Sequence, residues 1–162
     1  GKTPLYIACK NGHVDAARLL LDNGAEVNWA DKNGWTPLWT ACAHGHVDAA
    51  RLLLEKGAEK KRASKQGTTP LWIACQEGHV EAARLLLEKG AEVDRARKNG
   101  ETPLWIACQK GHFAVATLLL DNGAAVDRAN KNGTTPLSIA KQNCHSYVVG
   151  LLEEHLYPLL AA

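Results

Sequence analysis

Apolar residues occur in two short groups within each stretch of about 33 residues. In residues 67–99 the first group follows Pro70 and the second begins at Val80. Thr69 before the proline is typical of a helix start, because its hydroxyl can accept a backbone N–H and a proline at the first helical position loses no hydrogen bond. Gly78 separates the two groups and can end a helix in the left-handed conformation. The pattern therefore predicts two short helices joined by a tight turn.

The segment after the second apolar group is short and mostly polar. Residues 91–102 contain Asn99 followed by Gly100, a dipeptide that favours a tight turn. Because the segment is too short for a third helix, we expect an extended, hairpin-like finger. A helix pair of this size cannot bury both apolar faces by itself, whereas successive stacked pairs would share one continuous core.

The pattern repeats along the whole chain with a period of 33 residues, marked by prolines at 4, 37, 70, 103 and 136. Residues 1–33 and 67–99 are identical at 23 of their 33 positions. Such a period is typical of a solenoid of stacked units. We therefore predict a single all-α domain, residues 1–162, made of the units 1–33, 34–66, 67–99, 100–132 and the shorter 133–162.

The first and last units differ in their outer faces. The last unit has Glu153 where the others have a leucine, and its apolar tail, residues 156–160, could fold over the final face, so we expect a cap. Solenoid ends normally carry a polar outer face, but the first unit keeps Leu5 and Ile7 without such changes. This uncapped N-terminal face could self-associate, or the chain could be an excerpt from a longer array.

The repeated residues resemble one known family. The segments TPLYIAC, TPLWTAC and TPLWIAC, with GHVDAARLLL and NGAEVN after the first, are similar to the ankyrin repeat, and the resemblance covers the whole chain. It implies an ankyrin-repeat solenoid of helix-turn-helix pairs with hairpin-like fingers, and a concave surface that commonly binds protein partners. The family usually has histidine after Thr-Pro-Leu, whereas this chain has Tyr6, Trp39, Trp72, Trp105 and finally Ser138.

Composition narrows the functional classes. The 19 basic and 17 acidic residues give a formal charge of +2, which argues against nucleic-acid binding by bulk charge and makes it the lowest-ranked alternative. No stretch approaches the roughly 18 to 20 apolar residues of a membrane span. Four of the five cysteines follow the period, and we expect reduced, buried thiols in an intracellular, cytoplasmic or nuclear, protein. Cys144 replaces a helix-ending glycine, and we expect Asn143 to supply the left-handed residue.

Histidines recur in register at 13, 46, 79, 112 and 145, which raises the question of a metal or proton-relay site. Helices pack about 8 to 10 Å apart, so equivalent imidazoles lie too far apart to share a metal through bonds of about 2 Å. We interpret them as turn residues bonded to nearby backbone. A linear array cannot bring a nucleophile, a base and an orienting group together, so we predict no enzyme activity, no metal and no cofactor.

The aromatic positions from Tyr6 to Trp105 leave two interpretations open. They could form an exposed stripe on which a ligand or nucleobase stacks. We favour the alternative that the rings fill the space between first helix and finger, with each indole N–H bonded to a backbone acceptor.

If the repeated positions are structural, a partner should contact the positions that vary between units. These lie at the finger tips and on the solvent side of the first helices. On the fingers the expected contact residues are Lys32, Asn33, Trp35, Lys65, Gln66, Thr68, Lys98, Asn99, Glu101 and Lys131, and on the helices they are Ala43, His44, Gln76, Glu77, Gln109 and Lys110. Trp29 and Trp35 bracket one turn and are the expected anchors, since exposed tryptophan is enriched at binding hot spots.

A basic stripe runs beside these anchors, with Arg62, Arg95 and Arg128 in register next to the tip lysines. It is either a solvated face or a surface that steers the chain toward an acidic patch on a protein. We therefore predict a non-catalytic module that binds a protein partner on its concave finger and first-helix surface. The near identity of the units leaves one alternative, an engineered or consensus-like scaffold without a natural partner.

Overall fold

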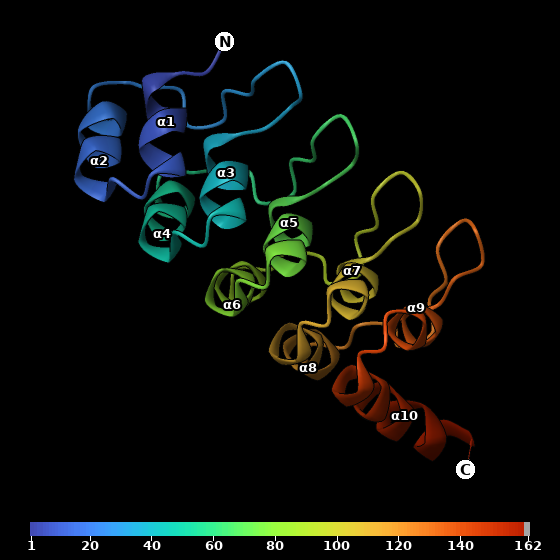
Figure 1. The fold of residues 1–162 in the computed structure, drawn as a ribbon. Coiled ribbons are helices and arrows are strands. Elements are labelled where there is room, and N and C mark those ends of the chain that lie inside the picture. Colours follow the sequence, from blue (N-terminus) through green and yellow to red (C-terminus); the bar gives the residue numbers. More distant parts are fainter. Residues whose placement is uncertain (161–162) are drawn as a thin grey trace.

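The computed structural model describes residues 1–160, and the side chains of residues 159 and 160 lie outside that description. The described residues form ten helices and no strand, which confirms the all-α prediction. Figure 1 shows successive helix pairs stacked along one line, with a finger leading from one pair to the next. The helices are α1 (Pro4–Lys10), α2 (Val14–Asp22), α3 (Pro37–Ala43), α4 (Val47–Glu55), α5 (Pro70–Glu77), α6 (Val80–Glu88), α7 (Pro103–Lys110), α8 (Phe113–Asp121), α9 (Pro136–Gln142) and α10 (Ser146–Leu160).

The odd-numbered helices begin as the Thr-Pro pattern predicts. In α5 the hydroxyl of Thr69 accepts a hydrogen bond from the backbone N–H of Trp72 at 3.1 Å, and Pro70 takes the first helical position. The helix ends at Gly78, which has a φ of 77° in the left-handed region. The helices α2, α4, α6 and α8 begin after a histidine whose side chain makes no capping bond. Local sequence therefore accounts for where the odd-numbered helices start and for where α5 ends.

One hydrophobic core runs through the stack. Each odd-numbered helix packs against its even-numbered partner and against the next odd-numbered helix. In α6, Ala82 and Ala83 are fully buried, so the helices can approach closely, and Leu86 fills the space between them. Burying a leucine side chain stabilises a fold by about 1.5 to 3 kcal/mol. Much of that burial depends on the adjacent repeat.

The fingers are hairpin-like loops. Each is closed by a backbone bond across its tip, such as that from Ser64 N–H to Thr68 O at 3.0 Å. Consecutive fingers are also joined to one another, since Lys65 N–H donates to Asn33 O at 2.9 Å and equivalent bonds recur between the later fingers. The four fingers therefore stand in a fixed register beside the odd-numbered helices (Figure 1).

The last unit is closed by an ion pair as well as by apolar residues. Lys141 takes the register of the buried cysteines, Glu153 takes that of a half-buried leucine, and their side chains pair at 2.8 Å between α9 and α10. In the expected apolar tail, Leu156 is half-buried and Tyr157 is exposed. The part of that prediction that concerns residues 159–160 lies outside the described side chains.

Candidate partner-binding surface

The aromatic residues after Thr-Pro-Leu belong to the core. Trp39, Trp72 and Trp105 are all buried. The indole N–H of Trp72 donates to Glu101 O in the next finger at 3.0 Å, and Trp105 makes the equivalent bond at 2.9 Å. Trp39 differs only in that its acceptor is the hydroxyl of Thr68, at 3.2 Å. The favoured interpretation is confirmed, and these rings cannot serve as a stacking stripe.

The expected anchor Trp35 is half-buried rather than freely exposed. Its ring stacks on that of Trp39, with centroids 4.8 Å apart and planes inclined by 7°. Its backbone N–H donates to Asp31 Oδ1 at 3.0 Å, which holds the finger closed. Because Trp39 covers one face of the indole, only the remainder of the Trp35 ring is available to a partner.

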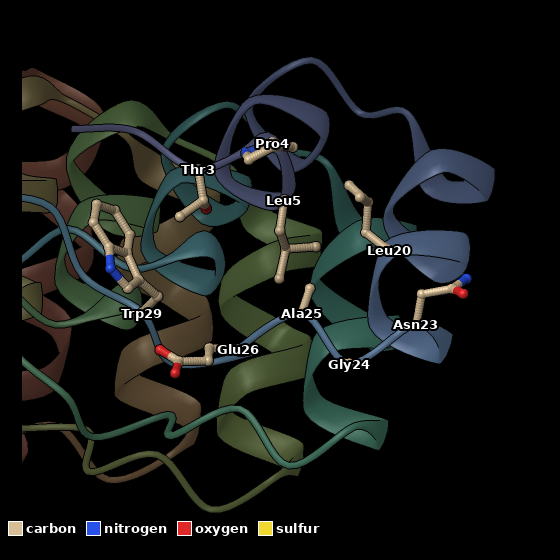
Figure 2. A pocket seen from close by; sticks show the side chains of 9 residues that line it. All are labelled: Thr3, Pro4, Leu5, Leu20, Asn23, Gly24, Ala25, Glu26 and Trp29. Atoms are coloured by element: carbon tan, nitrogen blue, oxygen red, sulfur yellow. The ribbon is translucent and has the colours of Figure 1, made fainter.

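Trp29 lies at the other end of the same finger, in different surroundings. Figure 2 shows it with Leu5 and Leu20 around an open hollow of about 400 Å³ at the first repeat. The corresponding place in the third repeat is also lined by Lys60 and Lys61 of the preceding repeat, and the hollow there shrinks to about 10 Å³. Trp29 is therefore part of the end face of the first repeat.

Two apolar side chains of the first repeat are exposed where later repeats bury them. Leu19 is 64% exposed, whereas Leu52 in the same register is 1% exposed. Ile7 is 42% exposed, whereas Ile73 is 6% exposed. In the later repeats a preceding helix pair packs over these positions. The structure therefore shows an exposed apolar face at the first repeat, as expected from the sequence. The self-association of this face stays a prediction.

The recurring histidines join neighbouring repeats. His46 Nε2–H donates to Lys10 O at 3.0 Å, and the three later histidines make the same contact with the repeat before them at 2.9 to 3.2 Å. The ring also covers the glycine that follows the preceding odd-numbered helix, since a Cβ on Gly12 would lie 2.6 Å from Nδ1 of His46. The histidines are structural, as interpreted, but their partner is the preceding repeat and not their own turn.

Cys144 adopts the left-handed conformation itself, with a φ of 59°. The prediction that Asn143 would do so is wrong, because its φ is −94°. Among the described residues no histidine covers position 144, so a Cβ is tolerated there at a backbone cost of roughly 1 to 2 kcal/mol. The Cys144 side chain is exposed.

The other four cysteines are unpaired, buried thiols. Burial raises the pKa of Cys9 and of Cys108 to about 12, and it raises the pKa of Cys42 and Cys75 as well. A protonated thiol is neither a nucleophile nor a good metal ligand. Within residues 1–160, no group of three or more His, Cys, Asp or Glu side chains could hold a metal ion. No helix in that range is long and apolar enough to cross a membrane.

Most of the side chains predicted to contact a partner reach solvent. They divide into an exposed set and a half-buried set. The exposed residues are Lys32, His44, Lys65, Gln66, Glu77, Lys98, Lys110 and Lys131, and the half-buried ones are Asn33, Ala43, Gln76, Asn99 and Gln109.

Thr68 and Glu101 are the exceptions. Thr68 is 7% exposed, and its hydroxyl is hydrogen-bonded to that of Ser64 inside the finger. The Glu101 carboxylate lies 3.5 Å from Arg97, whose guanidinium lies 5.0 Å from the centroid of the Trp72 ring. Both residues brace their own finger through the side chain four positions earlier. The sequence predictions did not include this pairing, although the matched polarity of each pair was a signal for it.

The three arginines of the predicted basic stripe lie on the loops that follow the even-numbered helices, away from the finger tips. They are Arg62, Arg95 and Arg128. Arg95 is 3.6 Å from the carboxylate of Glu92, and Arg128 donates to Asp94 O of the preceding repeat at 3.1 Å. Lys61 also binds Glu92, at 2.9 Å, and this contact holds the pKa of Glu92 below its usual range. Much of the positive charge of this stripe is therefore already paired with oxygen atoms of the chain itself.

A family model described as ankyrin repeats (3 copies) matches residues 1–64, 30–97 and 93–158. With the stacked helix pairs and the fingers, this match shows that the chain belongs to the ankyrin repeat family.

Segments of three longer proteins are also similar to it. Ankyrin repeat domain-containing protein 13B of Mus musculus is 46% identical over 35 residues, which is 22% of this chain and 6% of that protein. Cortactin-binding protein 2 of Rhinolophus ferrumequinum is 58% identical over 33 residues, which is 20% of this chain and 2% of that protein. Ankyrin repeat and KH domain-containing protein mask-1 of Caenorhabditis elegans is 54% identical over 33 residues, which is 20% of this chain and 1% of that protein. Each similarity thus concerns about one repeat of a much longer protein.

Proposed function

We propose that this chain is a non-catalytic module that holds a protein partner on its inner surface, formed by the fingers and the odd-numbered helices with their turns. Ankyrin repeats are generally protein–protein interaction modules. In this chain the inner surface comprises residues 1–13, 30–46, 63–79, 96–112 and 129–145.

One observation carries the proposal: the odd-numbered helices bury the cysteine that they share and expose residues that vary just after it. Cys42 and Cys75 share a register and are both 0% exposed. Two positions further on, the chain presents His44, Glu77 and Lys110, which are all exposed and differ in charge. Stacking requires the same residues at each interface, whereas recognition of a partner requires different ones. The variation on the inner surface therefore supports a binding role.

The chemistry of this surface also supports binding rather than catalysis. The thiols of the odd-numbered helices are buried and protonated. Four of the repeated imidazoles, such as that of His46, are hydrogen-bonded to a backbone carbonyl of the preceding repeat. The candidate nucleophiles and bases are thus used to hold the stack together. Unpaired thiols are also consistent with the expected reducing, intracellular compartment.

Affinity capture with two matched variants tests the proposal. One variant replaces His44, Glu77 and Lys110 by alanine on the inner surface. The control replaces three exposed residues of the even-numbered helices, Arg18, Arg51 and Arg84, by alanine.

Proteins captured from the native source by the unmodified chain should be retained by the control and lost by the inner variant, as measured by mass spectrometry. Equal retention by both variants would show that the inner surface is not the binding site. If no protein is retained by any form of the chain, the alternative of a scaffold without a natural partner is favoured.

A further inference from the structure

The near-neutral formal charge of the chain hides a separation of charge between its two sides. The inner surface carries nine Lys and Arg residues against three Asp and Glu residues, a formal charge of +6. The even-numbered helices carry three arginines against nine Asp and Glu residues, a formal charge of −6. The loops between them hold the remaining seven basic and five acidic residues, which leaves the total of +2. Figure 1 shows that the even-numbered helices lie on the side of the stack away from the fingers.

Most of the inner cations have no anionic partner among the described residues. Arg97 is close to Glu101, and Lys141 pairs with Glu153. In the described part of the chain, no carboxylate lies within 4.0 Å of the other seven, which are all lysines. They are Lys2, Lys10, Lys32, Lys65, Lys98, Lys110 and Lys131.

Four of these lysines form a row, with one on each finger. The backbone N–H of Lys65 donates to Asn33 O at 2.9 Å, and Lys98 and Lys131 make the equivalent bonds at 3.2 and 2.9 Å. With about 10 Å between stacked repeats, the row from Lys32 to Lys131 spans roughly 30 Å. Because the finger backbones are already held in place, binding would restrict only the lysine side chains, which lowers its entropic cost.

The same surface lacks the features that favour a nucleic acid. Single strands stack their bases on exposed aromatic rings, but Trp72 and Trp105 are buried and Trp35 has one face covered by Trp39. A spacing of about 10 Å corresponds to three residues of an extended peptide at about 3.3 Å each.

We propose that the inner surface binds an extended acidic segment of a protein partner, laid across the finger tips with its carboxylates against the row from Lys32 to Lys131. This inference rests on the proposed function and adds the chemistry of the partner to it. The carboxylates of the even-numbered helices repel the same segment, so the separation of charge also selects the side on which it binds. Exposed ion pairs are screened by salt, and binding should therefore weaken steeply as the salt concentration rises.

A peptide titration of the whole chain tests this inference directly. The probe is a synthetic peptide of about twelve residues with glutamate at every third position, which matches the spacing of the row. The matched control peptide has glutamine at those positions. In the ¹⁵N-labelled chain at low salt, the glutamate peptide should shift the amide signals of the four fingers and leave those of the even-numbered helices unchanged. The shifts should disappear at high salt, and the glutamine peptide should cause none.

Two charge variants distinguish binding at the lysine row from a general effect of the net charge of the chain. The variants K65Q/K98Q/K131Q and R18Q/R51Q/R84Q each remove three positive charges. The first should weaken binding of the glutamate peptide about tenfold, and the second by less than about twofold.

Three results would overturn the inference: equal weakening by both variants, absence of finger shifts at millimolar peptide, or tighter binding of a single-stranded oligonucleotide of the same length than of the peptide. If the peptide fails while the alanine variant of His44, Glu77 and Lys110 still loses its captured proteins, the proposed function stands without an acidic partner.

Discussion

At the first repeat of the solenoid apolar side chains meet solvent, whereas at the last repeat an ion pair joins α9 to α10. Leu19 is 64% exposed although its sequence neighbours hardly differ from those of Leu52, which is 1% exposed. At the other end, Lys141 and Glu153 replace a cysteine and a leucine and pair at 2.8 Å. Whether a residue is buried in this fold therefore depends on the presence of a neighbouring repeat as much as on the residue itself.

The same contrast holds for the backbone between the paired helices. Gly45 has a φ of 70° and lies under His79 of the next repeat, whose Nδ1 would be 2.6 Å from an added Cβ. Cys144 has almost the same backbone conformation and an exposed side chain. Two features therefore favour glycine at position 45: the left-handed backbone and the histidine ring packed against it. At position 144 only the left-handed backbone favours glycine.

The largest expected effect comes from two leucines in the same register. Leu52→Ala should lower the free energy of unfolding by about 2 to 5 kcal/mol, because it leaves a cavity between two repeats. Leu19→Ala, at an exposed position, should change it by less than about 0.5 kcal/mol. Urea unfolding followed by circular dichroism measures both. Similar losses in the two variants would mean that the first repeat is covered in solution, for example by a second copy of the chain.

The two left-handed positions should respond in opposite directions. Gly45→Ala should lower the free energy of unfolding by about 2 to 3 kcal/mol, because it adds the left-handed strain and displaces the hydrogen-bonded His79 ring. Cys144→Gly should raise stability by up to about 1 kcal/mol, since it removes strain without removing a contact between repeats. The measurement is again urea unfolding. A tolerated Gly45→Ala would contradict the role assigned to the histidine.

A third comparison isolates the hydrogen bond between repeats. His112 Nε2–H donates to Gln76 O at 2.9 Å, whereas His13 is exposed and its repeat has no predecessor in the described chain. His112→Ala should cost about 1 to 2 kcal/mol, and His13→Ala less than about 0.5 kcal/mol. Hydrogen exchange should show faster opening next to Gln76 only in the first variant. Equal effects of the two substitutions would refute the proposed bond.

The thiols provide a comparison that depends on pH. Burial raises the pKa of Cys108 from 9.0 to about 12. Above pH 9 the unfolded chain therefore loses this proton while the folded chain keeps it, so stability falls as the pH rises from 9 toward 12. Between pH 9 and 10 one such thiol lowers the free energy of unfolding by about 1 kcal/mol. Cys108→Ala should reduce this slope, and a slope equal to that of the unmodified chain would contradict the burial of Cys108.

The smallest effect is expected at the ion pair of the last repeat. The hydrogen bond to Glu153 raises the pKa of Lys141, so the contribution of the pair is complete below the ordinary lysine pKa of 10.5 and is lost as the pH rises through the higher folded value. Glu153→Gln should lower stability slightly at pH 7, and less so in high salt, because both side chains reach solvent. Thermal unfolding at two salt concentrations measures this. A loss that does not depend on salt would show that Glu153 contributes by packing instead.

Local patterns in the sequence were sufficient to predict the period, the helix starts at Thr-Pro and the burial of Trp72. These features depend on capping, backbone freedom and hydrophobicity, which act over a few residues. The predictions were wrong or incomplete where a residue meets a neighbouring finger or repeat, as for Thr68 and Cys144. Thr68 is bonded to Ser64 of its own finger and accepts from Trp39 of the preceding repeat, whereas no histidine of the described chain covers Cys144.

By itself, the sequence determined the repeat, the helix pairs and the residues that could form a common core. The tertiary structure decided which copy of each residue is buried, since Leu19 and Leu52 differ only in having a repeat above them. It also decided that a chain of formal charge +2 presents a basic inner surface and an acidic outer one. The physical reason is that stacking places the same helix of every repeat on the same side, so small local charges add along the solenoid.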